Sequence, residues 1–125
     1  MYKAPLEDYQ FLLDRVIGFD LLMADIGNDD VNQELADAVL EEAGKLAGNV
    51  IAPLNHSADM AGAKRLEDGN VKTPGGVSDA YAAMGEGGWT VMEADAGFGG
   101  QNLPMTLTTV VKELWQLASM ALTLC

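Results

Sequence analysis

Residues 31–52, VNQELADAVLEEAGKLAGNVIA, carry the clearest helical pattern in the chain. Their apolar residues recur at the three- and four-residue spacing of one helix face, with charged residues on the other side. The apolar stripe is Ala36, Val39, Leu40, Ala43, Leu46, Ala47, Val50 and Ile51. Asp30 is expected to cap the start of this helix, Gln33 to complete a capping box, and Pro53 to end it. Because several stripe residues are small, the pattern predicts that a second helix packs closely against this one.

Shorter helical patterns lie on both sides of this segment. The sequence predicts helices at 6–17, ended by Gly18, at 20–26, capped by Asp20, and at 78–86, capped by Ser78. A last long helix follows Pro104, and its apolar face comprises Leu107, Val110, Val111, Leu114, Leu117, Ala118 and Ala121. Residues 54–76 are expected to be irregular apart from one small hairpin near 65–73, with its turn at 67–70. Helices joined by loops predict an all-α bundle.

Length and charge restrict the class of protein. A chain of 125 residues suits a single domain, and 49% hydrophobic residues exclude a disordered acidic tail. With 19 acidic and 7 basic residues the net charge is −12, which argues against nucleic acid and against an anionic membrane surface as partners. The sequence shows neither a signal peptide nor an apolar run of about 18 residues, so a cytoplasmic location is expected. Cys125 is the single cysteine, which excludes an internal disulfide.

A search for reactive groups finds few candidates. His56 has Ser57 and Asp59 close in sequence, but catalytic triads are assembled by the fold rather than by neighbours in one segment. The acidic pairs at 29–30 and 41–42 lack the alternating ligands of a calcium loop, and we expect no metal site.

The glycine-rich loop 94–103, which contains GFGGQNL at 97–103, matches neither a phosphate-binding P-loop nor a dinucleotide fingerprint. It is either a tight turn or a place where backbone approaches a ligand. The apolar face of the last helix is likewise either bundle core or one side of an apolar ligand slot.

Several motifs, taken in order, resemble a known family. Gly87-Gly88-Trp89, then residues 99–104, GGQNLP, and then a helix with Glu113 are similar to the N-terminal helical domain of acyl-CoA dehydrogenases. The start, residues 2–6, YKAPL, followed by FLL at 11–13, resembles a longer bacterial branch of that family with an N-terminal extension.

Two departures from the family pattern concern the loop and the last helix. Asn102 stands where the family usually has glycine, and asparagine tolerates the same left-handed backbone. Trp115, Ser119 and Met120 occupy a stretch where the branch typically has Ala-Asn and an aromatic residue.

The resemblance implies an FAD-dependent enzyme of three domains that desaturates an acyl-CoA thioester between Cα and Cβ and passes electrons to an electron-transfer flavoprotein. In that family the catalytic base and the flavin contacts lie mainly outside the N-terminal domain. Residues 1–125 are therefore expected to be that domain, truncated within an apolar pattern, to hold no FAD tightly, to be inactive alone and to contain no catalytic residue. The expected contribution is one wall of the acyl pocket, formed by Gly99, Gly100, Leu107, Val110, Val111 and Leu114. Glu113 is interpreted as a structural or pocket-rim residue.

An alternative from a different class is a stand-alone acidic helical module that binds a partner helix through an exposed apolar face. Either interpretation leaves leucine, valine and methionine surface uncovered, so a homo-oligomer is expected.

Overall fold

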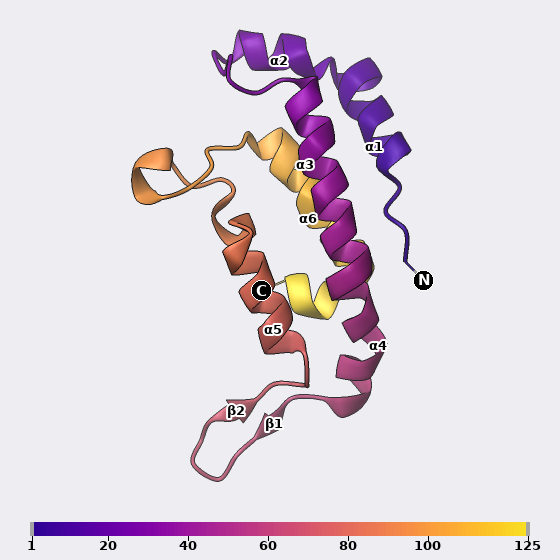
Figure 1. Cartoon of the computed structure of the whole chain (residues 1–125), viewed down its shortest axis with the longest axis vertical. Coiled ribbons are helices and arrows are strands. Elements are labelled where there is room, and N and C mark those ends of the chain that lie inside the picture. The colour runs from indigo at the N-terminus through magenta and orange to yellow at the C-terminus, as the bar shows by residue number, and fades with distance from the viewer. Residues whose placement is uncertain (1, 125) are drawn as a thin grey trace.

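The computed structural model describes residues 2–124, and expectations about Met1 and Cys125 lie outside the described residues. The molecule is an elongated set of helices with one small hairpin at its lower end (Figure 1), which confirms the all-α prediction. The helices are α1 (Leu6–Phe11), α2 (Phe19–Asp25), α3 (Gln33–Leu46), α4 (Ala52–Ala61), α5 (Val77–Glu86) and α6 (Met105–Thr123), and the strands are β1 (Lys64–Arg65) and β2 (Val71–Lys72). Wider π turns continue α1 over Leu12–Ile17 and join α3 to α4 over Ala47–Ile51, and short 3₁₀ turns lie at Trp89–Val91 and Ala96–Phe98.

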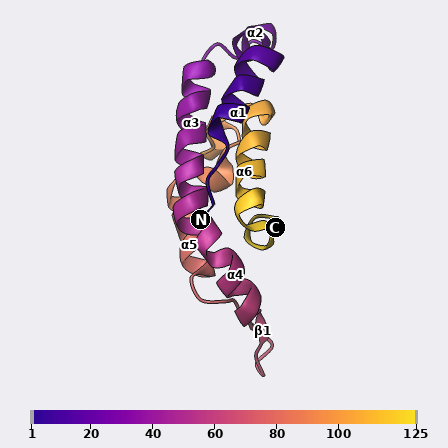
Figure 2. The ribbon, with the colours of Figure 1, turned by 90° about the vertical axis from the view of Figure 1, so that its right-hand side faces the viewer.

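The helix pair α3 and α6 forms the centre of the structure. The two helices lie side by side, with α1 along one side and α5 along another (Figures 1 and 2). The fully buried side chains come mainly from α3 with its π turn and from α6, and include Leu40, Ala43, Ala47, Ile51, Leu107, Val111 and Leu114. Each buried leucine or valine contributes about 1.5–3 kcal/mol relative to exposure, so this seam dominates the stability of the fold.

Two side-chain hydrogen bonds join elements far apart in sequence at this seam. The indole Nε1 of Trp115 donates to the carbonyl oxygen of Ala43 at 3.2 Å. The hydroxyl of Tyr2 donates to the carbonyl oxygen of Leu114 at 2.8 Å. The first bond joins α6 to α3, and the second holds the N-terminal segment against α6.

Two glycines outside the predicted apolar stripe let the N-terminal segment approach α3 and its π turn closely. A Cβ added at Gly44 would lie 3.2 Å from Cδ2 of Leu6, and one at Gly48 would lie 3.5 Å from the carbonyl oxygen of Tyr2.

The capping of α2 and α3 differs from the prediction. Asn32, not Asp30, caps α3, because its side chain accepts from the backbone N–H of Leu35 at 2.9 Å. Asp20 does not cap its own helix, which follows Gly18. Its carboxylate instead accepts from the backbone N–H of Gln33 at 2.6 Å and so satisfies a free donor at the start of the next helix.

Pro53 does not end the long helix, contrary to the prediction. The π turn before it rearranges the backbone, and Pro53 then lies in the first turn of α4, where its missing N–H leaves no bond unmade. Residues up to Ala61, expected to be irregular, are therefore helical. Ser78 is also not a cap, because α5 begins at Val77 directly after Gly76, which has a φ of +85°.

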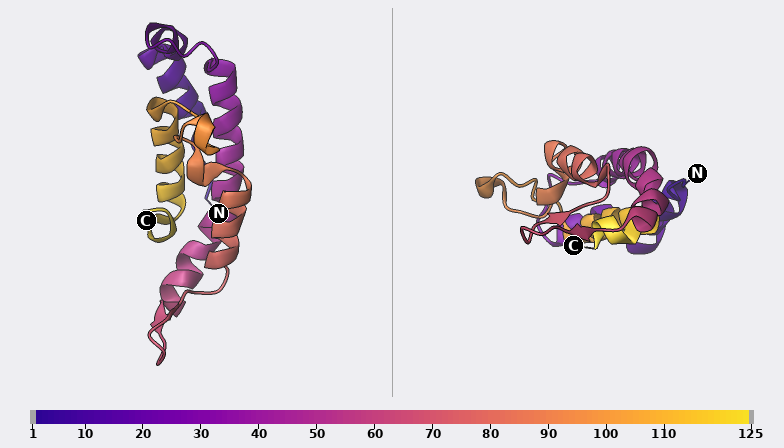
Figure 3. Two further views of the ribbon diagram at one scale, coloured as in Figure 1. Left: turned by 90° about the vertical axis from the view of Figure 1, so that its left-hand side faces the viewer. Right: turned by 90° about the horizontal axis from the view of Figure 1, so that it is seen from below.

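The predicted hairpin is confirmed. β1 pairs antiparallel with β2 in the register Lys64 with Lys72 and Arg65 with Val71. In its turn the backbone N–H of Gly69 donates to the carbonyl oxygen of Leu66 at 3.1 Å. The hairpin projects beyond the helices (Figure 3).

The last helix starts after Pro104 as predicted, but its backbone breaks at Ser119, where φ is −162° and ψ is 100°. The predicted apolar face is only partly correct: Leu117 and Ala121 are exposed, whereas Trp115, outside that face, is 4% exposed. Trp115 packs edge-on against Trp89, with ring centroids 5.4 Å apart at 79°.

Replacing Trp115 by phenylalanine is expected to lower the free energy of unfolding by about 1–3 kcal/mol, because the buried indole loses its hydrogen bond and its place is incompletely filled. Denaturant titration followed by circular dichroism measures the change. Tyr81→Phe, at a residue that is 63% exposed, is the control and should be neutral. Equal stability of the two variants would contradict the importance of the Trp115–Ala43 contact.

Candidate functional site

The glycine-rich loop before α6 bonds mainly to itself. The carboxylate of Asp95 accepts from the N–H of Gly97 at 2.7 Å, and the carbonyl oxygen of Asp95 accepts from the N–H of Gly100 at 3.1 Å. The N–H of Asn102 donates to the carbonyl oxygen of Ala94 at 2.9 Å. Donors that a ligand would need are thus already used within the loop.

Backbone geometry explains the residue types in this loop. Gly99 has a φ of +81°, and Asn102 has a φ of +51°, which confirms that asparagine adopts the left-handed conformation there. A Cβ on Gly100 would overlap the carbonyl oxygen of Ala94. Of the two interpretations of the loop, the tight turn is the one that the structure favours.

Glu93 fixes this loop to α6. Its carboxylate accepts hydrogen bonds from the hydroxyl of Thr108, which is fully buried, and from the ammonium of Lys112. These two donors, Lys112 first, lower the pKa of Glu93 below its usual value. Sequence reasoning missed Glu93, because no periodicity or motif links a loop carboxylate to a helix 15 to 19 residues further on.

The residues predicted to line an acyl pocket lie along one helix and the loop before it. Leu107, Val111 and Leu114 are fully buried in the core against the other helices, and Val110 is half-buried at its edge. Gly99 is exposed and Gly100 half-buried. Of the six, the two glycines and Val110 therefore present surface to a ligand as this chain is folded.

A cavity of about 680 Å³ lies at the opposite end of α6. It is bounded by α4, by the segments that lead into and out of the hairpin, by α5 and by the chain from the Ser119 break onward. Its lining is Ala58, Asp59, Gly62, Ala63, Thr73, Pro74, Val77, Ser78, Tyr81, Ser119, Ala121 and Leu122. The predicted pocket residues are not among them. Sequence reasoning missed this cavity, because the helical pattern of α6 gives no sign of the backbone break that helps to shape it.

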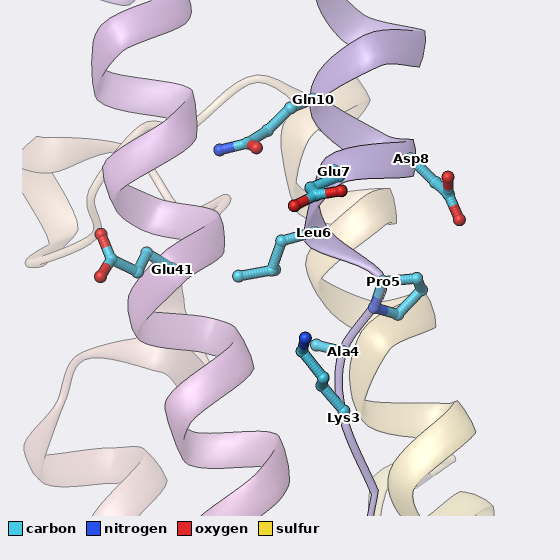
Figure 4. Close-up of a pocket in the computed structure, with 8 residues that line it drawn as sticks. All are labelled: Lys3, Ala4, Pro5, Leu6, Glu7, Asp8, Gln10 and Glu41. Atoms are coloured by element: carbon cyan, nitrogen blue, oxygen red, sulfur yellow. The ribbon is translucent and has the colours of Figure 1, made fainter.

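A second cavity, of about 470 Å³, lies between the N-terminal segment with α1 and the outer side of α3 (Figure 4). Figure 4 shows Ala4 and Leu6 pointing toward α3, whereas Asp8 points away. Lys3, Glu7 and Glu41 give it charges of both signs on a surface cleft. This mixture suits water better than a particular ligand.

Glu113 lies close to two tyrosines of the N-terminal segment. Burial, and then the negative charge of Glu113, raises the pKa of Tyr9 to about 12. The same two causes raise the pKa of Tyr2. Glu113 thus faces the segment that covers the α3–α6 seam.

His56 is exposed on α4. The hydroxyl of neighbouring Ser57 lies 3.3 Å from the carbonyl oxygen of Leu54, so it bonds to its own helix. Within residues 2–124, no three metal-ligating side chains come together, and no helix is long and apolar enough to cross a membrane.

One comparison bears on the resemblance seen in the motifs. The chain is 33% identical over 124 residues to 3-methylmercaptopropionyl-CoA dehydrogenase of Ruegeria pomeroyi. This similarity confirms the resemblance. The matched region is 99% of this chain but 21% of the relative, so the chain spans about a fifth of that protein's length. No protein-family model matches the chain.

Gly100→Ala is expected to destabilise the protein more than Gly99→Ala. The added methyl group at Gly100 meets backbone that cannot yield easily, and overpacking of this kind costs about 1–3 kcal/mol or more. At Gly99 the space is open, so only the left-handed backbone is strained, at about 1–2 kcal/mol. Thermal unfolding of the two variants tests the order, and a Gly100→Ala variant as stable as the native chain would contradict it.

Stability is expected to fall as the pH rises from about 10 to about 12. Over this range Tyr9 stays protonated in the folded protein while tyrosine ionises in the unfolded chain, which favours unfolding. Denaturant titrations across this pH range should show that the free energy of unfolding falls less for Tyr9→Phe than for the native chain. Tyr81→Phe, at an exposed position, is the control and should leave this fall unchanged.

Proposed function

We propose that this chain is the N-terminal helical domain of an FAD-dependent acyl-CoA dehydrogenase, an enzyme that desaturates an acyl-CoA thioester between Cα and Cβ. The observation that supports the proposal most strongly is the similarity over 99% of the chain to a dehydrogenase of a CoA thioester. The all-α fold and the left-handed Asn102 in the loop before α6 agree with it.

The glycine-rich loop before α6 does not fit the diphosphate of FAD. The loop that would have to hold the FAD diphosphate uses the N–H groups of Gly97, Gly100 and Asn102 for its own turns, and it carries the carboxylates of Glu93 and Asp95. A diphosphate needs free backbone donors or basic groups instead. In this proposal the flavin and the catalytic base belong to other domains of the parent protein.

The proposed role of this domain is to form one wall of the acyl pocket. Gly99, Gly100 and Val110 supply the accessible part of that wall. Leu107, Val111 and Leu114 hold α6 in place from within the core. The tie from Glu93 to Thr108 and Lys112 keeps the loop against the same helix.

The parent protein's partners in this proposal are an acyl-CoA substrate, an electron-transfer flavoprotein and further copies of the same chain. Homo-oligomerisation is supported by the apolar side chains left uncovered at the α1–α2 end, where Phe11, Val16 and Leu21 are 59%, 63% and 75% exposed. The same surface is the observation that favours the second candidate, a helical module that binds a partner helix.

A chimera tests the proposal. Residues 2–124 replace the matching segment of the Ruegeria pomeroyi enzyme, and flavin content and thioester desaturation are measured. We expect the chimera to hold FAD and to retain activity, and the isolated chain to show neither. Val110→Trp in the chimera should raise KM because it narrows the pocket, whereas Leu117→Trp, on an exposed part of the same helix, should leave KM unchanged.

Three results would count against the proposal. Stoichiometric FAD in the isolated chain would contradict the division of roles between domains. A folded chimera that holds FAD but desaturates no thioester would contradict the pocket role. Equal KM values for the two tryptophan variants would contradict the placement of the wall at Val110.

A further inference from the structure

The basic residues of this acidic chain gather on the hairpin. Lys64, Arg65 and Lys72 are three of its 7 basic residues, and all three are exposed. None of them forms an ion pair with a carboxylate of residues 2–124, in contrast to Arg15, Lys45 and Lys112.

The pairing register brings two of these charges together. Lys64 lies directly opposite Lys72 across the two strands. Like charges in this position repel and weaken a hairpin, so a bound anion would relieve the repulsion. Neither Glu67 nor Asp68 of the turn forms an ion pair with these lysines among the described residues. The carboxylate of Asp68 instead accepts from the backbone and side-chain N–H groups of Asn70 at 3.0 and 2.9 Å.

The cavity of about 680 Å³ opens beside this basic hairpin. Ala63 and Thr73, which line it, are the residues immediately before Lys64 and immediately after Lys72. The volume lies within the range of about 300–1,000 Å³ that is usual for small-molecule sites.

The cavity and the hairpin differ in chemistry. Val77, Leu122 and several alanines make much of the cavity lining apolar, and Asp59 is its single charged residue. An apolar chain therefore suits the cavity, whereas an anionic group would be repelled from it and would find its counter-charges on the hairpin.

We propose that this cavity and the basic hairpin together bind an amphiphile with one apolar chain and an anionic head, of the kind represented by an alkyl phosphate. The apolar chain occupies the space between α4, α5 and the end of α6. The head lies among Lys64, Arg65 and Lys72. The residues involved differ from those proposed for the acyl wall, so this site does not depend on the proposed dehydrogenase role.

Calorimetric titration of the 125-residue chain tests the site with three probes: decyl phosphate, decyltrimethylammonium and inorganic phosphate, each below any micelle-forming concentration. We expect decyl phosphate to bind with one-to-one stoichiometry. The other two probes should bind with affinities at least about tenfold lower. The comparison with the cation is demanding, because a chain of net charge −12 would attract a cationic amphiphile non-specifically.

Matched variants separate the two parts of the site. Lys64→Glu with Lys72→Glu should weaken decyl phosphate about tenfold, whereas Lys3→Glu with Lys45→Glu changes the net charge equally and should not. Ala63→Phe, at an exposed residue of the lining, should weaken both amphiphiles because it narrows the cavity. Circular dichroism of each variant verifies folding.

Equal binding of the two amphiphiles by the native chain, or equal losses in the two double variants, would overturn the proposal. So would decyl phosphate that binds no better than inorganic phosphate.

Discussion

The close approach of α3 and α6 is the constraint on which the rest of the structure depends. Ala43 and Ala47 on one side allow Leu114 and Trp115 on the other to sit deep in the seam. The indole of Trp115 then reaches the carbonyl oxygen of Ala43. Larger residues in place of the two alanines would separate the helices and break this hydrogen bond. The small side chains thus permit both the close packing of the helices and the hydrogen bond of the buried indole.

The N-terminal segment depends on the same seam. Tyr2 donates to a carbonyl oxygen of α6, while Leu6 packs where Gly44 leaves room on α3. Burial of Tyr9 within this segment, and then the negative charge of Glu113 on α6, account for the raised pKa of Tyr9. One side of the helix pair is thereby closed, whereas the side toward α5 and the hairpin retains a cavity.

Periodicity predicted the helices well, because apolar burial at the seam is what selects them. The helix ends were predicted less well, since they depend on partners from other elements. Asp20 satisfies a donor of α3 rather than of its own helix, and Pro53 is accommodated by a π turn that no sequence pattern announces. In the loop, the behaviour of Asn102 was predictable because it is a local backbone property. The roles of Glu93 and the cavity were not, because both arise from tertiary contacts.

The two ends of α6 differ in a way that net charge conceals. At its start the N–H groups of the preceding loop bond within the loop, and the carboxylates of Glu93 and Asp95 lie beside them. Few donors are therefore free to bind an anion there. At its end the helix breaks at Ser119 beside an apolar cavity and a hairpin whose cations form no ion pair with the carboxylates of residues 2–124. The net charge of −12 is a sum over the whole chain and does not show this local difference. The positions of the seven basic residues decide which ligands each end of α6 can accept.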